Sequence, residues 1–192
     1  MTVALLAASV VLVGILCLLN LVLVLALAKR VRDLATAVAQ ARHTGTVRGG
    51  FLAVGETVGE FTARTVDGGE LTRDALTGGA VVGFFSTSCG GCREMIPVFV
   101  EHARDLRDQG RLALAVVVAA ERDDPTSYVE PLAQVARVVV EGHEGLLGSA
   151  FKVGAFPAFC VIGGHARVGA VSADPGEVVH AHVAASSGKA GA

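Results

Sequence analysis

The chain has 192 residues, and its 16 lysines and arginines against 18 aspartates and glutamates give a formal net charge of −2 at pH 7. Because this balance provides no basic surface for phosphate groups, nucleic acid is not expected as a partner. The four cysteines are too few and too widely spaced for a disulfide scaffold. The length allows one domain with its own hydrophobic core and one additional segment.

No charged residue occurs in the apolar run 3–28 at the start of the chain. A helix of this length would reach about 39 Å, which exceeds the roughly 30 Å hydrocarbon core of a bilayer. A cleaved signal peptide is the alternative, since Ala26, Leu27 and Ala28 resemble a cleavage site, but the run lacks basic residues before it and is longer than a signal-peptide core. We therefore expect residues 1–28 to be a retained transmembrane anchor that contacts membrane lipid through 3–28.

Residues 29–50 connect this run to the rest of the chain and begin with a basic cluster at Lys29, Arg30 and Arg32. By the positive-inside rule, taken alone, this cluster would leave the following domain in the cytoplasm. Apolar residues at spacings of three and four then continue a helical pattern for about two heptads, which is too short to predict a coiled coil. Glycine and threonine at 44–50 end the pattern, so 29–50 is expected to be a juxtamembrane helix and a linker.

From residue 51 onwards the pattern is that of an α/β domain. The apolar run 80–86 predicts a buried central strand, and the apolar residues after it recur at helical spacing until Gly110 ends the helix. The other predicted elements are a hairpin of 61–66 and 70–71, a strand at 112–120, a helix at 125–135, a strand at 137–140, a helical turn at 146–151, two strands at 159–162 and 167–171, and a final helix from Pro175. This order predicts a mixed central sheet with helices on both faces, in a domain at 51–186 followed by a flexible tail at 187–192.

Cys89 and Cys92 lie where the buried strand 80–86 ends and the next helix begins. Free N–H groups and the positive end of the helix dipole stabilise an anion at this place, so Cys89 is expected to react as a thiolate. Cys92 should be less exposed, yet close enough to displace a substrate from a mixed disulfide with Cys89. A C-x-x-C motif at a strand-to-helix junction therefore predicts thiol–disulfide exchange.

A metal site is the competing interpretation of the same cysteines. Cys89 and Cys92, with Cys160 and a histidine, could serve as soft ligands for Cu(I) or zinc, as in a metallochaperone. The histidines show no ligand spacing apart from His180 and His182, which fit the surface of a terminal helix. Cys160 fits a small apolar core residue better than a third redox thiol. No metal is therefore expected, although the metallochaperone stays open as an alternative.

Three segments of this domain resemble the thioredoxin-like family. They are FFSTSCGGC at 84–92, Pro97 in the following helix, and KVGAFPAF at 152–159. The resemblance covers about residues 51–185, and the N-terminal run is similar to the membrane-anchored branch with the TlpA/ResA-type proteins and the methylamine dehydrogenase accessory protein. It implies a thioredoxin fold, a redox-active Cys89–Cys92 disulfide, a cis-proline at Pro157, and a substrate strand that pairs with the backbone of Phe156.

The chain departs from the family at the positions that tune the dithiol. Ser88 replaces a bulky residue before the first cysteine, Gly83 stands where thioredoxins bury an aspartate, and Gly90 and Gly91 separate the cysteines. The proton acceptor for Cys92 is left open among Asp67, Glu70 and water. The redox direction is open as well, because Gly-Gly is typical of neither reducing nor oxidising members.

The expected function is that of a membrane-tethered, single-pass thiol–disulfide oxidoreductase without a cofactor. Its partners would be protein substrates with disulfides or dithiols and a membrane electron donor or acceptor, as in cytochrome c maturation or disulfide formation in a partner enzyme. The family resemblance implies an extracytoplasmic domain, which we prefer over the cytoplasmic location that the basic cluster at 29–32 alone would indicate.

Overall fold

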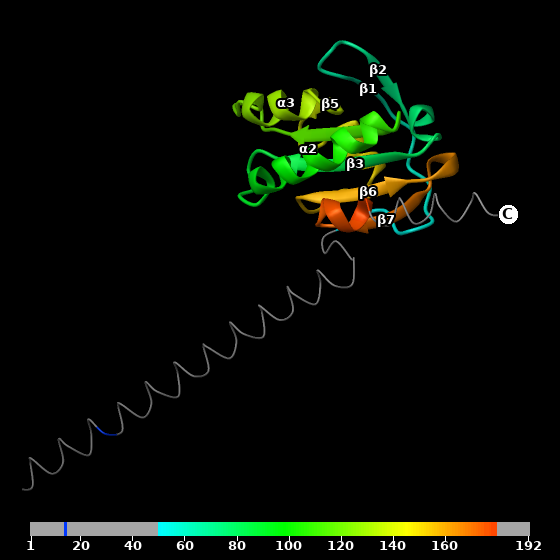
Figure 1. Cartoon of the computed structure of the whole chain (residues 1–192). Coiled ribbons are helices and arrows are strands. Elements are labelled where there is room, and N and C mark those ends of the chain that lie inside the picture. Colours follow the sequence, from blue (N-terminus) through cyan, green and yellow to red (C-terminus); the bar gives the residue numbers. More distant parts are fainter. Residues whose placement is uncertain (1–13, 15–49, 180–192) are drawn as a thin grey trace, which may run out of the picture. The chain divides into compact units, whose positions relative to one another are not determined.

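A computed structural model describes residues 50–179 and Gly14 (Figure 1). The expected anchor, the juxtamembrane helix with its linker, and the tail lie outside these residues, apart from Gly14 and Gly50. Among the residues described, no helix has the length and apolar character needed to cross a bilayer. Residues 50–179 belong to one compact unit of the chain.

A five-stranded mixed sheet forms the centre of this unit, in the order β5-β4-β3-β6-β7. Its strands are β3 (Ala80–Ser86), β4 (Leu112–Val118), β5 (Arg137–Glu141), β6 (Ala158–Ile162) and β7 (Val168–Ser172). Strands β3, β4 and β5 run parallel, whereas β6 is antiparallel to both β3 and β7. The predicted mixed sheet is confirmed, and β3 has the bounds expected from its apolar run.

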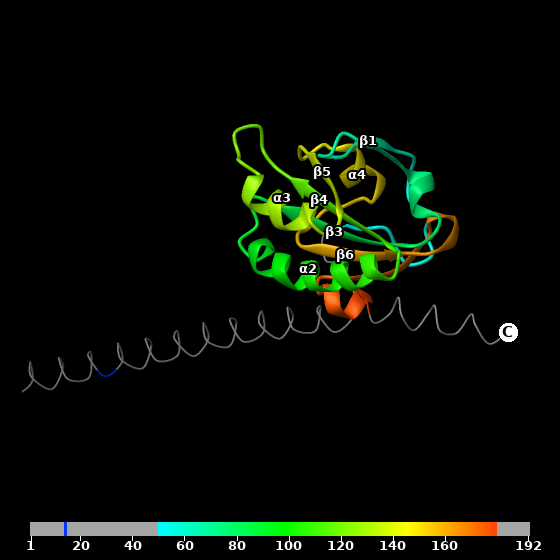
Figure 2. The same cartoon turned by 45° about the horizontal axis from the view of Figure 1, so that its top comes forward.

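The helices cover both faces of the sheet (Figure 2). On one face lie α2 (Cys92–Asp108), α3 (Thr126–Ala133) and the helical residues 175–179. On the other lie α4 (Leu146–Ala150), the 3-10 helix η1 (Arg73–Leu76) and the antiparallel hairpin of β1 (Thr62–Arg64) and β2 (Glu70–Thr72). A second 3-10 helix, η2 (Gly164–Ala166), connects β6 to β7.

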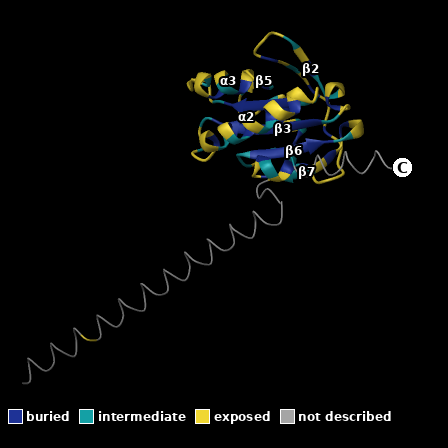
Figure 3. Cartoon of the chain, viewed as in Figure 1, coloured by how far each residue is buried: buried dark blue, intermediate teal, exposed yellow. Residues whose placement is uncertain are grey.

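Each face of the sheet packs its own apolar core (Figure 3). Since side chains alternate along a strand, Phe84 enters the core beneath α4 and the hairpin, whereas Phe85 enters the core beneath α2. The same alternation sends Cys160 of β6 to the first core and Phe159 to the second. The face to which a side chain points therefore decides whether it can reach the dithiol.

Most of the other predicted bounds differ from the observed ones by one or two residues. Strand β4 ends at Val118, not at residue 120, because the Ala120 N–H turns to the carboxylate of Asp123 at 3.4 Å. Helix α2 begins at Cys92, so Cys89 lies in the turn before the helix. The predicted stop after α2 is confirmed by Gly110, whose φ of +71° falls in the left-handed region that glycine adopts most easily.

Candidate functional site

Cys89 and Cys92 lie at the carboxyl end of β3, where the sequence predicted them. A turn links the strand to α2: the Cys89 N–H donates to the Ser86 carbonyl at 3.1 Å, and the Cys92 N–H donates to the Cys89 carbonyl at 3.2 Å. Cys89 is half-buried and Cys92 is fully buried at 0% exposure. Both carry free thiols, so the structure describes the reduced dithiol.

Burial gives the Cys92 thiol a strong preference for its protonated form. Loss of hydration is the main cause that raises the pKa of Cys92 to about 12, and a hydrogen bond with the Cys89 side chain acts in the same direction. The Ser86 N–H, which donates to the Cys92 sulfur at 3.4 Å, lowers this pKa and only partly offsets the burial. At neutral pH the exposed member of the pair is therefore the one available to attack a partner.

The backbone of Phe156 lies against Cys89, and Pro157 follows it. The peptide bond between them is cis, as expected from the sequence resemblance. The Cys89 thiol donates to the Phe156 carbonyl at 3.4 Å, across 67 residues of sequence. The half-buried Phe156 ring packs against the cores on both faces of the sheet, so it lies at the sheet edge beside the thiol.

Two serines lie next to the dithiol, and from the sequence Ser88 was noted only as a departure from the family and Ser86 was given no role. Ser86 is buried at the end of β3, and its hydroxyl pairs with the hydroxyl of Ser88 at 2.9 Å. The Ser88 N–H also donates to the Ser86 hydroxyl at 3.3 Å, which fixes the turn that carries Cys89. A polar residue that closes an otherwise apolar strand was the signal that could have identified Ser86.

Cys160 does not belong to this site. It is fully buried in β6 on the face opposite Cys92, between its strand neighbours Val82 and Val171. Burial alone raises the pKa of its thiol, as for a core residue. Within residues 50–179, no three His, Cys, Asp or Glu side chains lie together in a position to hold a metal ion.

The place of a buried acid beside Cys92 is occupied by aromatic rings. A Cβ atom on Gly83 would come within 2.9 Å of the Phe99 ring and 3.1 Å of the Phe159 ring. These two rings stack at 5.9 Å between centroids beneath α2. The site therefore has no room for a carboxyl group on residue 83.

The two acidic candidates for the proton acceptor lie elsewhere. The carboxylate of Asp67 accepts hydrogen bonds from Thr65 and from the Gly69 N–H, within the β1–β2 turn. The backbone carbonyl of Glu70 is held at 2.8 Å by Arg137, the first residue of β5. By the strand register Arg137 is level with Val82 in the sheet, about 13 Å from the end of β3.

Glu141 is a third carboxylate, level with Ser86 in the sheet. It lies on the face opposite Cys92, where its oxygens accept from the N–H groups of Leu147 and Gly148 at 3.0 and 2.7 Å. Burial raises the pKa of Glu141, and these two hydrogen bonds oppose the increase. Its carboxylate thus holds the start of α4 and does not reach the dithiol.

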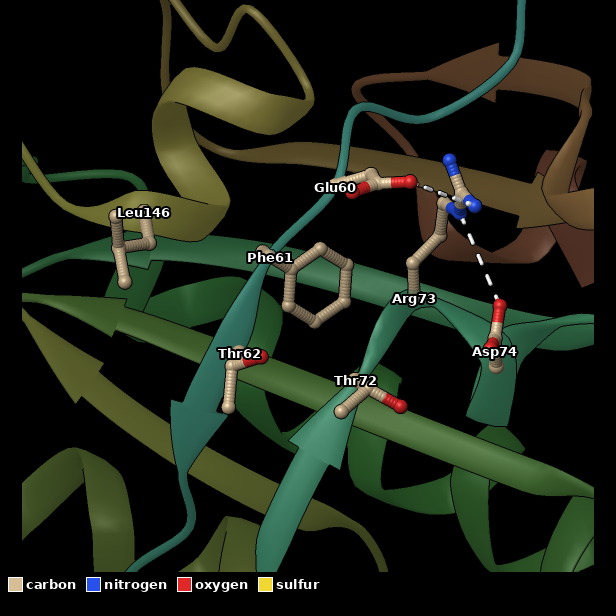
Figure 4. Close-up of a pocket in the computed structure, with 7 residues that line it drawn as sticks. All are labelled: Glu60, Phe61, Thr62, Thr72, Arg73, Asp74 and Leu146. Carbon is tan, nitrogen blue, oxygen red and sulfur yellow. Dashed lines mark ion pairs between the residues drawn. The ribbon is translucent and has the colours of Figure 1, made fainter.

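A pocket between the β1–β2 hairpin, η1 and α4 is separate from the dithiol (Figure 4). The basic residue in its lining is Arg73, whose guanidinium lies 3.2 Å from the Glu60 carboxylate and 3.9 Å from the Asp74 carboxylate. The pocket opens on the sheet face opposite α2. With its cation already paired and no thiol in its lining, it is not a candidate for the chemistry of Cys89.

No family model and no curated protein matches the chain. Solved structures match at low sequence identity. The thioredoxin domain of a thiol-disulfide oxidoreductase from Bacteroides vulgatus matches with 14% identity and a TM-score of 0.56, over 69% of this chain and 97% of that one.

Two further structures agree with this match. A thiol:disulfide interchange protein from Bacteroides sp. matches with 16% identity and a TM-score of 0.56, over 67% and 87% of the two chains. A thioredoxin family protein from Chlorobium tepidum, a thiol:disulfide interchange protein, matches with 22% identity and a TM-score of 0.56, over 70% and 98%. The described part of the chain therefore has a thioredoxin-like fold, as the sequence predicted.

Proposed function

We propose that the protein is a thiol–disulfide oxidoreductase that exchanges electrons with dithiols and disulfides of partner proteins. One observation carries this proposal: Cys89 is half-exposed before α2, Cys92 is buried behind it, and the Phe156 carbonyl, just before the cis bond to Pro157, contacts the Cys89 thiol. The solved structures with the same fold that are described above bear names of the same activity.

The buried and exposed thiols divide the reaction into two steps. To reduce a partner, the Cys89 thiolate attacks one sulfur of the partner's disulfide, forms a mixed disulfide and releases the other sulfur as a thiolate. Cys92 then loses its proton, attacks the Cys89 sulfur and frees the partner, which leaves a Cys89–Cys92 disulfide and moves two electrons. Oxidation of a partner is the reverse sequence, and another protein dithiol supplies or takes the electrons, so no cofactor is required.

The substrate segment would lie along Phe156. In the reduced form the Phe156 carbonyl accepts a hydrogen bond from the Cys89 thiol, so the backbone at this position faces the reacting sulfur. An extended partner segment that pairs with this backbone would place its cysteine next to Cys89. Phe156 and Pro157 would act as positioning residues, and Cys89 and Cys92 as the reacting groups.

Trapping of mixed disulfides tests the proposal. With Cys92→Ala the second step cannot occur, so partner proteins should stay bound to Cys89 and be released by a reductant. The matched controls are Cys160→Ala, which should resolve its mixed disulfides as the native chain does, and Cys89→Ala, which should trap no partner. No trapped partner from the Cys92→Ala chain, together with one equivalent of metal that copurifies with the native chain, would instead support the metallochaperone.

The membrane tether and its orientation are also part of the proposal. The apolar run 3–28 would anchor the chain as a single-pass membrane protein, with the domain on the extracytoplasmic side. Protease added to intact protoplasts or spheroplasts should then digest the domain. A domain that is protected in intact cells and digested after lysis would place it in the cytoplasm, as the positive-inside rule alone predicts.

A further inference from the structure

A groove of about 580 Å³ runs between α2 and α3 and begins beside the dithiol. Six of its residues come from one side of α2 and two come from α3: Arg93, Ile96, Pro97, Val100, Glu101 and Arg104, with Ser127 and Pro131. The α2 residues recur at spacings of three, one, three, one and three, so they form a continuous stripe along one face of the helix. The groove therefore extends along α2 away from Cys92.

The middle of this groove is apolar. Ile96 is buried at its base, while Val100 and Pro131 are half-buried and the ring of Pro97 is exposed. No main-chain donor is available at Pro97 or Pro131, because proline has no N–H. An apolar side chain from another molecule could pack here against the side chains of Ile96, Val100 and Pro131, which have no hydrogen-bonding groups.

Two arginines mark the ends of the groove. Arg93 follows Cys92 directly, and its guanidinium lies 5.4 Å from the ring centre of Tyr128, which holds the charge at the end nearest the dithiol. Arg104 lies three turns further along α2, about 16 Å away. Within residues 50–179 neither arginine forms an ion pair with a carboxylate, and Glu101 is the one acid in the lining.

The position of the groove indicates its occupant. A partner joined to Cys89 by a disulfide must lie against this end of α2, since only three residues separate Cys89 from Arg93. Two unpaired cations about 16 Å apart along the helix, with an apolar floor between them, are complementary to an extended segment with two acidic residues four positions apart. Because side chains alternate along an extended chain, this even spacing turns both acids to the groove, and the long side chains bridge the difference from the roughly 13 Å that four extended residues span. The apolar residue midway between the acids would face Ile96, Val100 and Pro131.

We propose that the α2–α3 groove docks an acidic segment with an apolar centre, next to the exchanging cysteine of the redox partner protein. This inference rests on the proposed function, because the partner reaches the groove through its reaction with Cys89. The groove would select the partner by charge and apolar contact, while Phe156 and Pro157 position the reacting sulfur.

Peptide disulfides test the proposal on the full chain in a neutral detergent, with Cys92→Ala so that Cys89 alone reacts. The acidic probe has a cysteine, a short glycine spacer and two glutamates four positions apart, with three leucines and valines between them. In the basic probe lysines replace the glutamates. Each probe cysteine is joined to thionitrobenzoate, which leaves as a coloured thiolate when Cys89 forms the peptide disulfide, so the release rate measures docking and exchange together.

The acidic probe should react about fivefold faster than the basic probe, as expected for two exposed charge contacts of ordinary strength. Arg93→Gln with Arg104→Gln should abolish this preference, and raised salt should weaken it. The matched control is Arg64→Gln with Arg111→Gln, which removes the same amount of charge from β1 and from the turn after α2. This control should keep the preference for the acidic probe. A neutral N-acetylcysteine amide disulfide reports the intrinsic reactivity of Cys89, and all rates are divided by its rate.

The outcomes separate the groove from the redox function. Equal rates for the two peptides would overturn the docking proposal, and so would a preference for the acidic peptide that survives in the double groove variant. In either case a normal rate with the neutral probe would still support Cys89 as the reactive thiol. No release from any probe would overturn the proposed function and, with it, the docking proposal. Self-association of the native chain that is lost in the double groove variant, measured by size-exclusion chromatography, would assign the groove to a second copy and overturn the docking proposal.

Discussion

Cys89 and Cys92 are three residues apart, yet the fold gives them different environments. Cys89 is half-buried in the turn before α2, whereas Cys92 is fully enclosed by the apolar core beneath that helix. In the proposed reaction, the burial that raises the pKa of Cys92 would keep its proton in place until Cys89 has reacted. This difference in exposure is the reason why we propose attack by the first cysteine and resolution by the second.

The stability of the reduced protein should depend on Cys92 at alkaline pH. The folded state holds the proton more tightly than the unfolded state, since the pKa rises from 9.0 to about 12. The stabilisation is therefore complete below pH 9 and is lost as the pH rises towards 12. Between pH 8 and 10 the reduced native chain should lose about 1 kcal/mol more free energy of unfolding than Cys92→Ala.

Urea denaturation at a series of pH values measures this difference. Cys160 is present in both proteins and cancels in the comparison. Equal losses of stability for the two chains between pH 8 and 10 would show that the folded state does not hold the Cys92 proton more tightly than the unfolded state does.

Gly83 should tolerate no carboxylate, although it stands where thioredoxins bury an aspartate. The rings of Phe99 and Phe159 occupy the space that a side chain would need, and a buried charge there would have no partner. We expect Gly83→Asp to lower the free energy of unfolding by more than about 3 kcal/mol, and Gly83→Ala to lower it by about 1–3 kcal/mol. Thermal or urea unfolding gives both values, and a Gly83→Asp variant as stable as the native chain would contradict the packing described here.

At the level of elements, the apolar runs allowed most of the sheet to be predicted. The run 80–86 has no polar residue before Ser86, so its strand could be bounded from sequence, and the C-x-x-C placed the dithiol at its end. The strand after α2 was predicted two residues too long, because the side chain of Asp123, which turns the chain away, gives no signal in an apolar pattern.

The neighbours of each strand could not be predicted in the same way. Which face Cys160 shares with other residues depends on the register between β3 and β6, and this register is set by contacts far apart in the sequence. The closure of the Gly83 position by Phe99 and Phe159, and the groove between α2 and α3, depend on the same long-range packing.

The segment that leads into the domain supports the loop before Pro157. The Leu52 N–H donates to the Phe151 carbonyl at 3.0 Å, and the Gly154 N–H donates to the Gly50 carbonyl at 2.8 Å. Leu52 itself is 4% exposed in the core beneath α4. The segment at 50–52 therefore holds the chain only a few residues before the peptide bond that faces Cys89.

Leu52→Ala should weaken this support. We expect a loss of about 2–4 kcal/mol in the free energy of unfolding and faster amide hydrogen exchange at 152–157. Val54→Ala is the matched control, since Val54 is 65% exposed and its truncation should change stability by less than about 0.5 kcal/mol. Unchanged exchange at 152–157 in a destabilised Leu52→Ala chain would show that the loop is held independently of the preceding segment.

At the scale of the whole described domain, the sheet brings three distant parts of the chain to one edge. The dithiol follows β3, the Phe156–Pro157 bond precedes β6, and α3 with the far wall of the groove follows β4. In the proposed function, the thioredoxin-like fold would thus provide a reactive sulfur, a surface for a substrate strand, and the groove between α2 and α3. Cys160 is excluded from all three by its place on the opposite face.

A redox titration of the full chain tests the central claim most directly. The chain is equilibrated with glutathione at a series of oxidation states, its free thiols are blocked by alkylation, and the modified cysteines are identified by mass spectrometry. A single two-electron transition should convert Cys89 and Cys92 into one disulfide, while Cys160 stays a thiol. The potential should change by about 30 mV for each tenfold change in the ratio of oxidised to reduced protein. A transition that includes Cys160, or a Cys89–Cys92 pair that remains reduced at the most oxidising ratio, would contradict the proposed function.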